Sequence, residues 1–207
     1  MLEVSVDRDV TWTSEEYRRS HEGRVGVLLE DGTVPKPVCI DSNSGASGWE
    51  VRHWSVYDGA ATYVPRPRAH VLHAECSCGW TGTRHTVDWT AAADLAFRES
   101  GLATAERCEE DWDTHITAVG NTTVPLPAEL EELLQAVAAA IEHLGRDAPT
   151  AALKAARSLE LIAQRTAYWP ARDARDHELE NVAAALGLNL DDTRGLLARY
   201  GRWSPYG

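Results

Sequence analysis

RAHVLHAECSCGW, residues 68–80, is the stretch that decides the architecture of the N-terminal half of the chain. It predicts a β-strand that delivers Cys76 into a tight turn, with Cys78 two residues later. Gly79 permits the positive φ that such a turn requires, and the turn frees backbone N–H groups to point at thiolate sulfur. We therefore expect a structural zinc knuckle at Cys76 and Cys78, with Trp80 shielding the metal.

Two thiolates need two further ligands to close a tetrahedral zinc site. The first candidate is His115 and the second is Cys108, with His85 as the main alternative for the fourth ligand. Cys108 and His115 are seven residues apart, about 10.5 Å of rise along an α-helix, so Cys108 fits only if it precedes the regular helix. A competing interpretation treats the paired cysteines as core residues, since reduced cysteine is among the most buried residue types.

The residues before the knuckle predict short strands separated by turns. Apolar residues alternate along 25–29 before an Asp-Gly pair at 31–32, which is a β-hairpin signal. The same arrangement recurs where Trp54 and Val56 alternate before the Asp-Gly pair at 58–59. Residues 89–118 then predict two helices separated by Gly101.

The loop of residues 121–127, with its two prolines, is the predicted domain boundary. We expect a β-rich domain over 1–122, with the C-x-C-G-W site and packed helices, and a helical domain over 127–207. One apolar stripe at helical spacing opens the second domain. Its members are Leu130, Leu133, Leu134, Val137, Ala138, Ile141 and Leu144. The predicted fold class is α+β, with a β-rich N-terminal half and an all-α C-terminal helical bundle.

The last helix pair, within residues 178–202, has the pattern of a helix-turn-helix. Gly187 makes the turn, and Asn189 can cap the second helix. In a DNA-binding version the N-terminal side chains of that helix would enter the major groove. The candidate DNA contacts are Arg194, Arg199 and Arg202.

Two carboxylates stand against this interpretation of the helix pair. Asp191 and Asp192 place negative charge where phosphates would approach the second helix. The alternative is a helical hairpin that closes the bundle and makes no contact with DNA.

Composition and charge narrow the classes of function. The chain has 207 residues, of which 43% are hydrophobic and 25% charged, with a formal net charge of −12. This acidic balance argues against non-specific nucleic-acid binding by the whole protein. The N-terminus lacks a basic segment followed by an apolar one, so we expect a cytoplasmic protein with reduced cysteines and no membrane segment.

The common catalytic motifs do not occur in the sequence. It contains no G-x-G-x-x-G, P-loop, G-x-S-x-G or H-E-x-x-H pattern. A catalytic zinc would also need an open coordination position with an acid or base nearby. The sequence therefore favours a protein that is not an enzyme, with metal-dependent catalysis as a lesser alternative.

With these residues in place, the chain resembles a family of uncharacterised actinobacterial proteins. The family couples a C-x-C-G-W knuckle and a W-x-x-H helix to an Ala/Arg-rich helical tail that ends in a helix-turn-helix-like L-G pattern. The matching segments are Cys76-Ser77-Cys78-Gly79-Trp80, Trp112-Asp113-Thr114-His115 and Leu186-Gly187-Leu188. The resemblance implies a bacterial, cytoplasmic, regulatory protein and brings no reaction with it.

Our leading hypothesis is a zinc-stabilised regulatory or accessory protein that acts through protein contacts and, through residues 178–202, on DNA. The alternative is a protein-binding or structural module with no nucleic-acid role. A third hypothesis uses the acidic residues 106–113 to imitate the charge of DNA. A homodimer is compatible with each of them.

Overall fold

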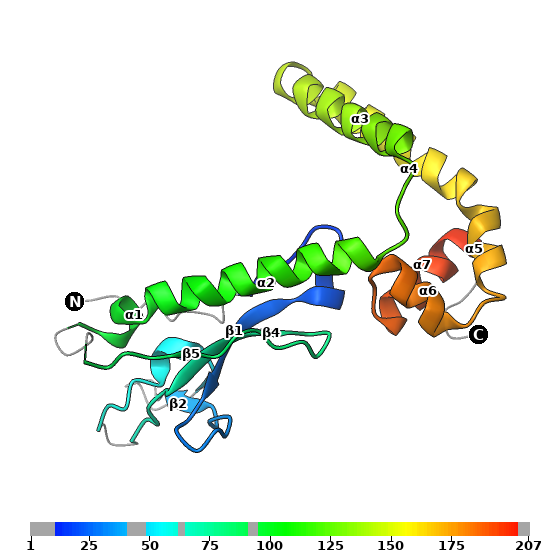
Figure 1. Cartoon of the computed structure of the whole chain (residues 1–207). Helices are drawn as coiled ribbons and strands as arrows, with labels where there is room; N and C mark the ends of the chain where they lie inside the picture. The colour runs from blue at the N-terminus through cyan, green and yellow to red at the C-terminus, as the bar shows by residue number, and fades with distance from the viewer. Residues whose placement is uncertain (1–10, 41–48, 62–64, 91–94, 203–207) are drawn as a thin grey trace. The chain divides into compact units, whose positions relative to one another are not determined.

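The structure is a computed structural model that describes residues 11–40, 49–61, 65–90 and 95–202. The chain divides into two compact units, Met1–Ala118 and Val119–Gly207, and each is described by itself. The first unit holds small antiparallel sheets, and the second is helical (Figure 1). The mixed fold class predicted from the sequence is confirmed.

The main sheet of the first unit has three antiparallel strands in the order β1-β4-β5. They are β1 (Gly23–Leu28), β4 (Val71–Cys76) and β5 (His85–Thr86). The register pairs Gly23 with Cys76 at one end and Leu28 with Val71 at the other. A second sheet pairs β2 (Val38–Ile40) with β3 (Trp49–Val51). Val71–Cys76 thus form the strand predicted before the knuckle, which is the middle strand of the main sheet.

Two local predictions before the knuckle were wrong. The Asp31-Gly32 turn forms, with a positive φ of 79° at Gly32, but β1 pairs with the distant β4 rather than with the residues after that turn. Trp54 and Val56 lie in a 3₁₀ turn, η2 (Trp54–Val56), instead of a strand. The ring of His53 caps this turn by accepting a hydrogen bond from the Ser55 N–H, a local bond that competes with strand pairing.

One long helix covers the sheet (Figure 1). The short α1 (Phe97–Ser100) ends at Gly101, and α2 (Leu102–Thr122) begins directly after it. A side chain at Gly101 would come within 2.6 Å of the Trp54 ring, so glycine permits the close packing there. The buried side chains of α2 are spaced at helical intervals and join the core that contains Leu72 of β4.

Beyond the end of α2, the described part of the second unit contains five helices. They are α3 (Ala128–Asp147), α4 (Pro149–Thr166), α5 (Tyr168–Ala174), α6 (Leu179–Leu186) and α7 (Leu190–Gly201). α3 and α4 form a hairpin joined by Ala148 alone, while α5 and α6 pack on α7. Among the described residues, no helix is both long enough and apolar enough to cross a membrane.

Candidate metal centre

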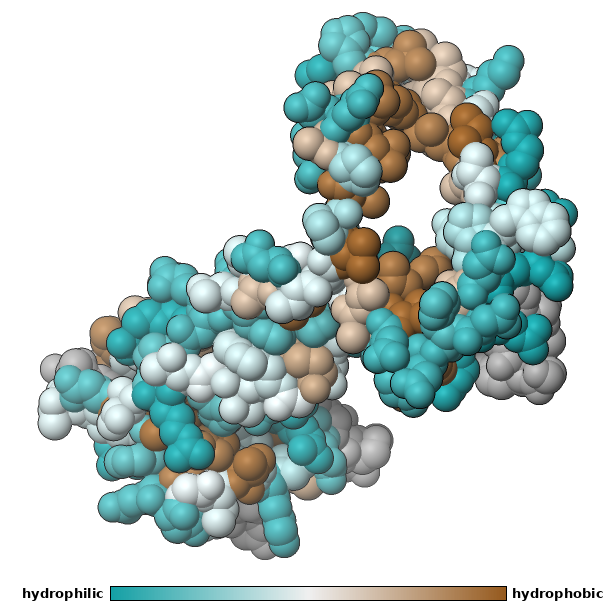
Figure 2. All heavy atoms as spheres, turned by 45° about the vertical axis from the view of Figure 1, so that its right-hand side comes forward, coloured by the Kyte–Doolittle hydropathy of each residue, from teal (hydrophilic) through white to brown (hydrophobic). Residues whose placement is uncertain are grey.

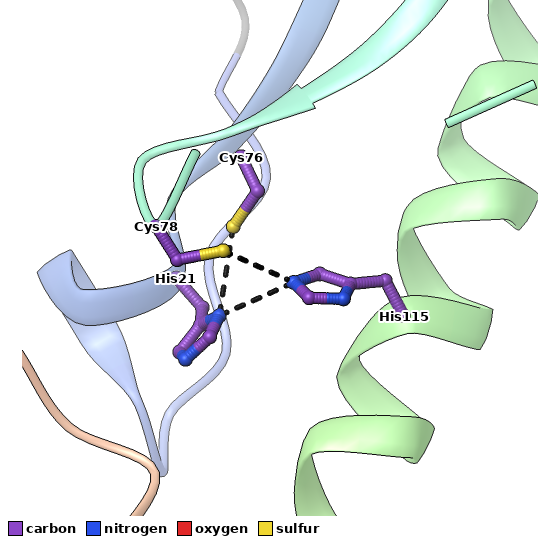
Figure 3. Close-up of side chains that lie close together, drawn as sticks. All are labelled: His21, Cys76, Cys78 and His115. Carbon is purple, nitrogen blue, oxygen red and sulfur yellow. Dashed lines mark hydrogen bonds between the residues drawn. The ribbon is translucent and has the colours of Figure 1, made fainter. Parts of the chain in front are cut away.

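Four side chains of the first unit converge on one point: His21, Cys76, Cys78 and His115 (Figure 3). One ligand atom from each lies within 4.8 Å of every other. His21 Nδ1 is 3.6 Å from Cys76 Sγ and 3.3 Å from His115 Nε2, and His115 Nε2 is 3.4 Å from Cys78 Sγ. His21 and Cys76 are buried, His115 is half-buried and Cys78 is exposed. A cluster of two histidines and two cysteines with this spacing can hold a metal ion.

The two cysteines are placed by a tight turn at the end of β4. Cys76 donates its backbone N–H to the Trp80 carbonyl, and Gly79 donates its own to the Cys76 carbonyl, each at 2.9 Å. Gly79 has a φ of 93°, a conformation that favours glycine over residues with a side chain. This turn brings the sulfurs of Cys76 and Cys78 to the same side, as the C-S-C-G spacing predicted.

Ser77 fixes the segment that carries His21 against this turn. Its N–H donates to the Glu22 carbonyl at 2.8 Å, and its hydroxyl donates to the Arg19 carbonyl at 2.9 Å. The same hydroxyl oxygen accepts the Glu22 N–H at 2.9 Å. His21 ends the 3₁₀ turn η1 (Arg18–His21), between the two residues that Ser77 holds. The knuckle and the third ligand are therefore one hydrogen-bonded assembly.

His115 reaches the cluster from α2. Trp112 lies three residues before it, and Trp112 is buried in the core, so the same helix that covers the sheet aims the imidazole at the knuckle. The Trp80 indole stacks on that imidazole, with ring centroids 4.3 Å apart. The stacked ring limits rotation of His115 and covers one of its faces.

The pKa shifts of Cys76 and His115 affect metal binding in opposite ways: the first disfavours the ligating thiolate and the second favours the ligating neutral imidazole. Burial raises the pKa of the Cys76 thiol, and a hydrogen bond from the Cys78 backbone opposes part of this rise. Burial, followed by the nearby His21, lowers the pKa of His115, so its imidazole is neutral and offers a lone pair. A bound cation stabilises the thiolate and requires a neutral imidazole, so metal binding would release the thiol protons.

The structure brings together three of the residues proposed from the sequence, Cys76, Cys78 and His115, and places Cys108 elsewhere. Cys108 is fully buried in the core, and its thiol donates to the Thr104 carbonyl at 3.3 Å. Burial, with a smaller effect of Asp111, raises its pKa to about 12. Cys108 is therefore a neutral core thiol inside the helix–sheet interface, the role that the competing interpretation of the sequence gave to the paired Cys76 and Cys78.

His85, the other candidate for the fourth ligand, also lies outside the cluster. Its Nε2 pairs with the Asp111 carboxylate at 2.9 Å, and the same carboxylate accepts the Thr83 N–H at 3.1 Å. This interaction ties β5 to α2. The fourth position belongs instead to His21, which the sequence reasoning missed because it lies 55 residues before Cys76.

The three candidate DNA contacts lie at separate points of α7 and its end. Arg194 is paired with Asp191 at 2.8 Å, one turn back on the same helix. The guanidinium of Arg199 lies 5.7 Å from the Tyr200 ring, and that of Arg202 lies 5.5 Å from the Tyr168 ring. Asn189 caps α7 by accepting the Asp192 N–H at 2.8 Å, as the sequence predicted.

Comparisons with protein-family models, with curated proteins and with solved structures each found no match for this chain.

Proposed function

We propose that this chain is a zinc-stabilised regulatory or accessory protein. The observation that carries the proposal is the spacing of the four ligand atoms. In a tetrahedral site with Zn–S bonds of about 2.3 Å and Zn–N bonds of about 2.0 Å, ligand atoms lie roughly 3.3–3.8 Å apart. The contacts of 3.3, 3.4 and 3.6 Å in this cluster fall in that range.

The number and type of ligands favour a structural zinc. Two thiolates and two imidazoles fill the tetrahedron, whereas a catalytic zinc keeps one position for water or substrate. The ion would join three separate segments: η1 through His21, the turn after β4 through Cys76 and Cys78, and α2 through His115. Its contribution is to hold the long helix on the sheet.

Protein contacts rather than DNA contacts are the proposed mode of action. The arginine nearest the start of α7, Arg194, is already paired with Asp191. The Asp191 side chain is 93% exposed and presents its carboxylate at the surface where phosphates would approach. Both observations argue against DNA contact by this helix pair and leave protein contact as the proposed role. The bacterial, cytoplasmic and regulatory setting is carried over from the family resemblance.

Elemental analysis of purified chain tests the zinc proposal. We expect one zinc per chain in the unaltered protein and a large loss in His21→Asn, the ligand that distinguishes this site from the alternatives. His70→Asn is the matched control, because His70 is an exposed histidine just before β4. Cys108→Ala should also retain zinc, since Cys108 lies outside the cluster.

Equal metal content in His21→Asn and the unaltered chain would contradict the four-residue site. Zinc that is lost in Cys108→Ala while it remains in His21→Asn would restore Cys108 as a ligand. Binding to genomic DNA at low salt, measured on the same samples, would contradict the preference for protein contacts.

A further inference from the structure

The helix α3 carries an apolar stripe that the described residues of its own unit do not cover. Among its twenty residues none is buried. Leu133 is 58% exposed and Leu134 is 53% exposed, and the other large apolar residues of the stripe are at least partly exposed. An amphipathic helix gains most of its stability from packing its apolar face, so an uncovered stripe of this length indicates a missing partner.

The α3–α4 hairpin cannot supply that partner from within. Where α4 meets α3 its buried residue is Ala152, a small side chain that lets the helices approach but covers little surface. Leu159 and Ile162 of α4 remain exposed, and Ile162 is 47% exposed. Figure 2 shows the brown apolar side chains gathered over α3 and α4. The two helices together therefore present one apolar face, formed by the α3 stripe with Leu159 and Ile162.

The charges of the two helices are opposite in sign. α3 has one basic residue, Arg146, against five acidic residues: Glu129, Glu131, Glu132, Glu142 and Asp147. α4 has one acidic residue, Glu160, against three basic residues: Lys154, Arg157 and Arg165. A surface that is acidic along one half and basic along the other is complementary to a copy of itself.

We infer that the apolar face of the α3–α4 hairpin binds a second copy of this chain and forms an antiparallel four-helix bundle. This inference rests on the proposed role of protein contacts and names the partner. A homodimer joined by one self-complementary patch is the commonest oligomer of soluble proteins. Four helices from two hairpins bury the apolar stripes that two helices leave open.

Charge selects between the two symmetric ways of stacking the hairpins. A two-fold axis perpendicular to the helices would set α3 on α3 and α4 on α4, which opposes like charges. A two-fold axis parallel to the helices sets α3 of each copy beside α4 of the other, and the acidic helix then faces the basic one. Complementary charges beside an apolar seam determine the partner and orientation in helical assemblies. The structure assigns the second arrangement.

The mass of the full chain in solution tests the inference, measured by light scattering after size exclusion across a micromolar concentration series. We expect about twice the chain mass of 22.7 kDa. Leu134→Glu should weaken dimerisation by at least about 100-fold, because each copy would bury an unpaired charge. Leu102→Glu is the matched control, since Leu102 is an exposed leucine of α2 in the other unit.

Two charge-reversal variants, measured alone and mixed, test the pairing of α3 of one copy with α4 of the other. One variant reverses the net charge of α3 (Glu131→Lys with Glu142→Lys and Asp147→Lys), and the other reverses that of α4 (Lys154→Glu with Arg165→Glu). Each variant alone should dimerise more weakly than the unaltered chain. In the first, a basic α3 would face the basic α4, and in the second the acidic α3 would face an acidic α4. An equimolar mixture should form a heterodimer, since both of its interfaces are again complementary while each hairpin is unchanged.

An unaltered chain that stays at the single-chain mass overturns the inference, as does a Leu134→Glu variant that dimerises as tightly as the control. A mixture that stays monomeric overturns the α3–α4 pairing. Zinc content measured in the same fractions tests the metal proposal independently. A monomer that contains zinc refutes only the dimer. A dimer without zinc refutes only the metal site.

Discussion

The indole of Trp80 lies parallel to the imidazole of His115, with planes 4° apart and centroids separated by 4.3 Å. The two residues come from different elements, the turn after β4 and the helix α2. The indole therefore restricts the His115 ring to the orientation in which Nε2 faces the sulfurs. In many metal sites a neighbouring hydrogen-bonding group orients the ligating histidine in the same way.

Trp80→Ala should weaken zinc binding by roughly 10- to 100-fold, the range typical for loss of a group that orients a ligand. Trp80→Phe should retain most of the affinity because a planar ring can still stack. Competition with a chromogenic chelator measures the affinity of each variant. Trp169→Ala serves as the control, because Trp169 is an exposed tryptophan of α5. Equal affinity in Trp80→Ala and the unaltered chain would show that the stacking does not support the site.

Ser77→Ala removes the hydroxyl that holds both Arg19 and Glu22 to the knuckle. We expect a loss of about 1–2 kcal/mol in the unfolding free energy of the zinc-loaded chain, the value of one or two net hydrogen bonds. Chemical denaturation followed by tryptophan fluorescence measures it. Ser158→Ala is matched in chemistry, since the Ser158 hydroxyl only donates to a carbonyl of its own helix, and it should change stability little. A Ser77→Ala variant as stable as Ser158→Ala would show that the Ser77 hydroxyl does not stabilise the contact between the knuckle and the His21 segment.

Removal of the metal should disturb the first unit and leave the second intact. All four ligands belong to Met1–Ala118, while α3–α7 lie in Val119–Gly207. Since structural zinc binding contributes directly to folding, a chelator should greatly increase amide hydrogen exchange in β1, β4 and the part of α2 near His115. Exchange in α3–α7 should stay unchanged. Similar increases in both units would mean that the zinc supports the whole chain.

The cysteines of the knuckle could be predicted because the turn that places them is local. Cys76, Cys78 and Gly79 lie within four consecutive residues, and the backbone requirement of the turn is visible in the sequence itself. His115 was also accessible, since helical spacing places it on the side of α2 that carries Trp112. Helices were predicted within residues 127–207 from apolar residues at helical spacing, and α3–α7 form there among the described residues.

His21 could not be predicted because its position depends on a non-local register. β1 pairs with β4 so that Gly23 stands opposite Cys76, and this sets the segment just before β1 beside the knuckle. The Asp31-Gly32 pair had indicated a local hairpin instead, which would have kept His21 away from the cysteines. Knowing the β1–β4 pairing would have been enough to nominate His21, and a single sequence does not contain that information.

Cys108 provides a test by pH, because burial holds its thiol neutral well above the ordinary range. Its pKa is raised from 9.0 to about 12 in the folded chain, so the folded state keeps a proton that the unfolded state loses. The contribution of this group to stability is therefore complete below about pH 9, declines as pH rises from there, and is lost by about pH 12. The decline is limited to about 1.4 kcal/mol per pH unit for one proton.

Cys108→Ala should lower stability at neutral pH, because it removes a fully buried side chain from the core. The gap between the unaltered chain and the variant should then narrow above pH 9, since only the unaltered chain loses the contribution of the buried thiol. Urea denaturation at a series of pH values from neutral to alkaline measures both curves. Cys39→Ser is the control, because Cys39 is exposed and should leave the pH dependence as it is.

A gap between the unaltered chain and Cys108→Ala that stays constant above pH 9 would show that Cys108 is not held neutral by burial. A gap that widens as the pH rises toward about 9, and is constant above it, would show that the folded state stabilises the thiolate, as a metal ligand would require.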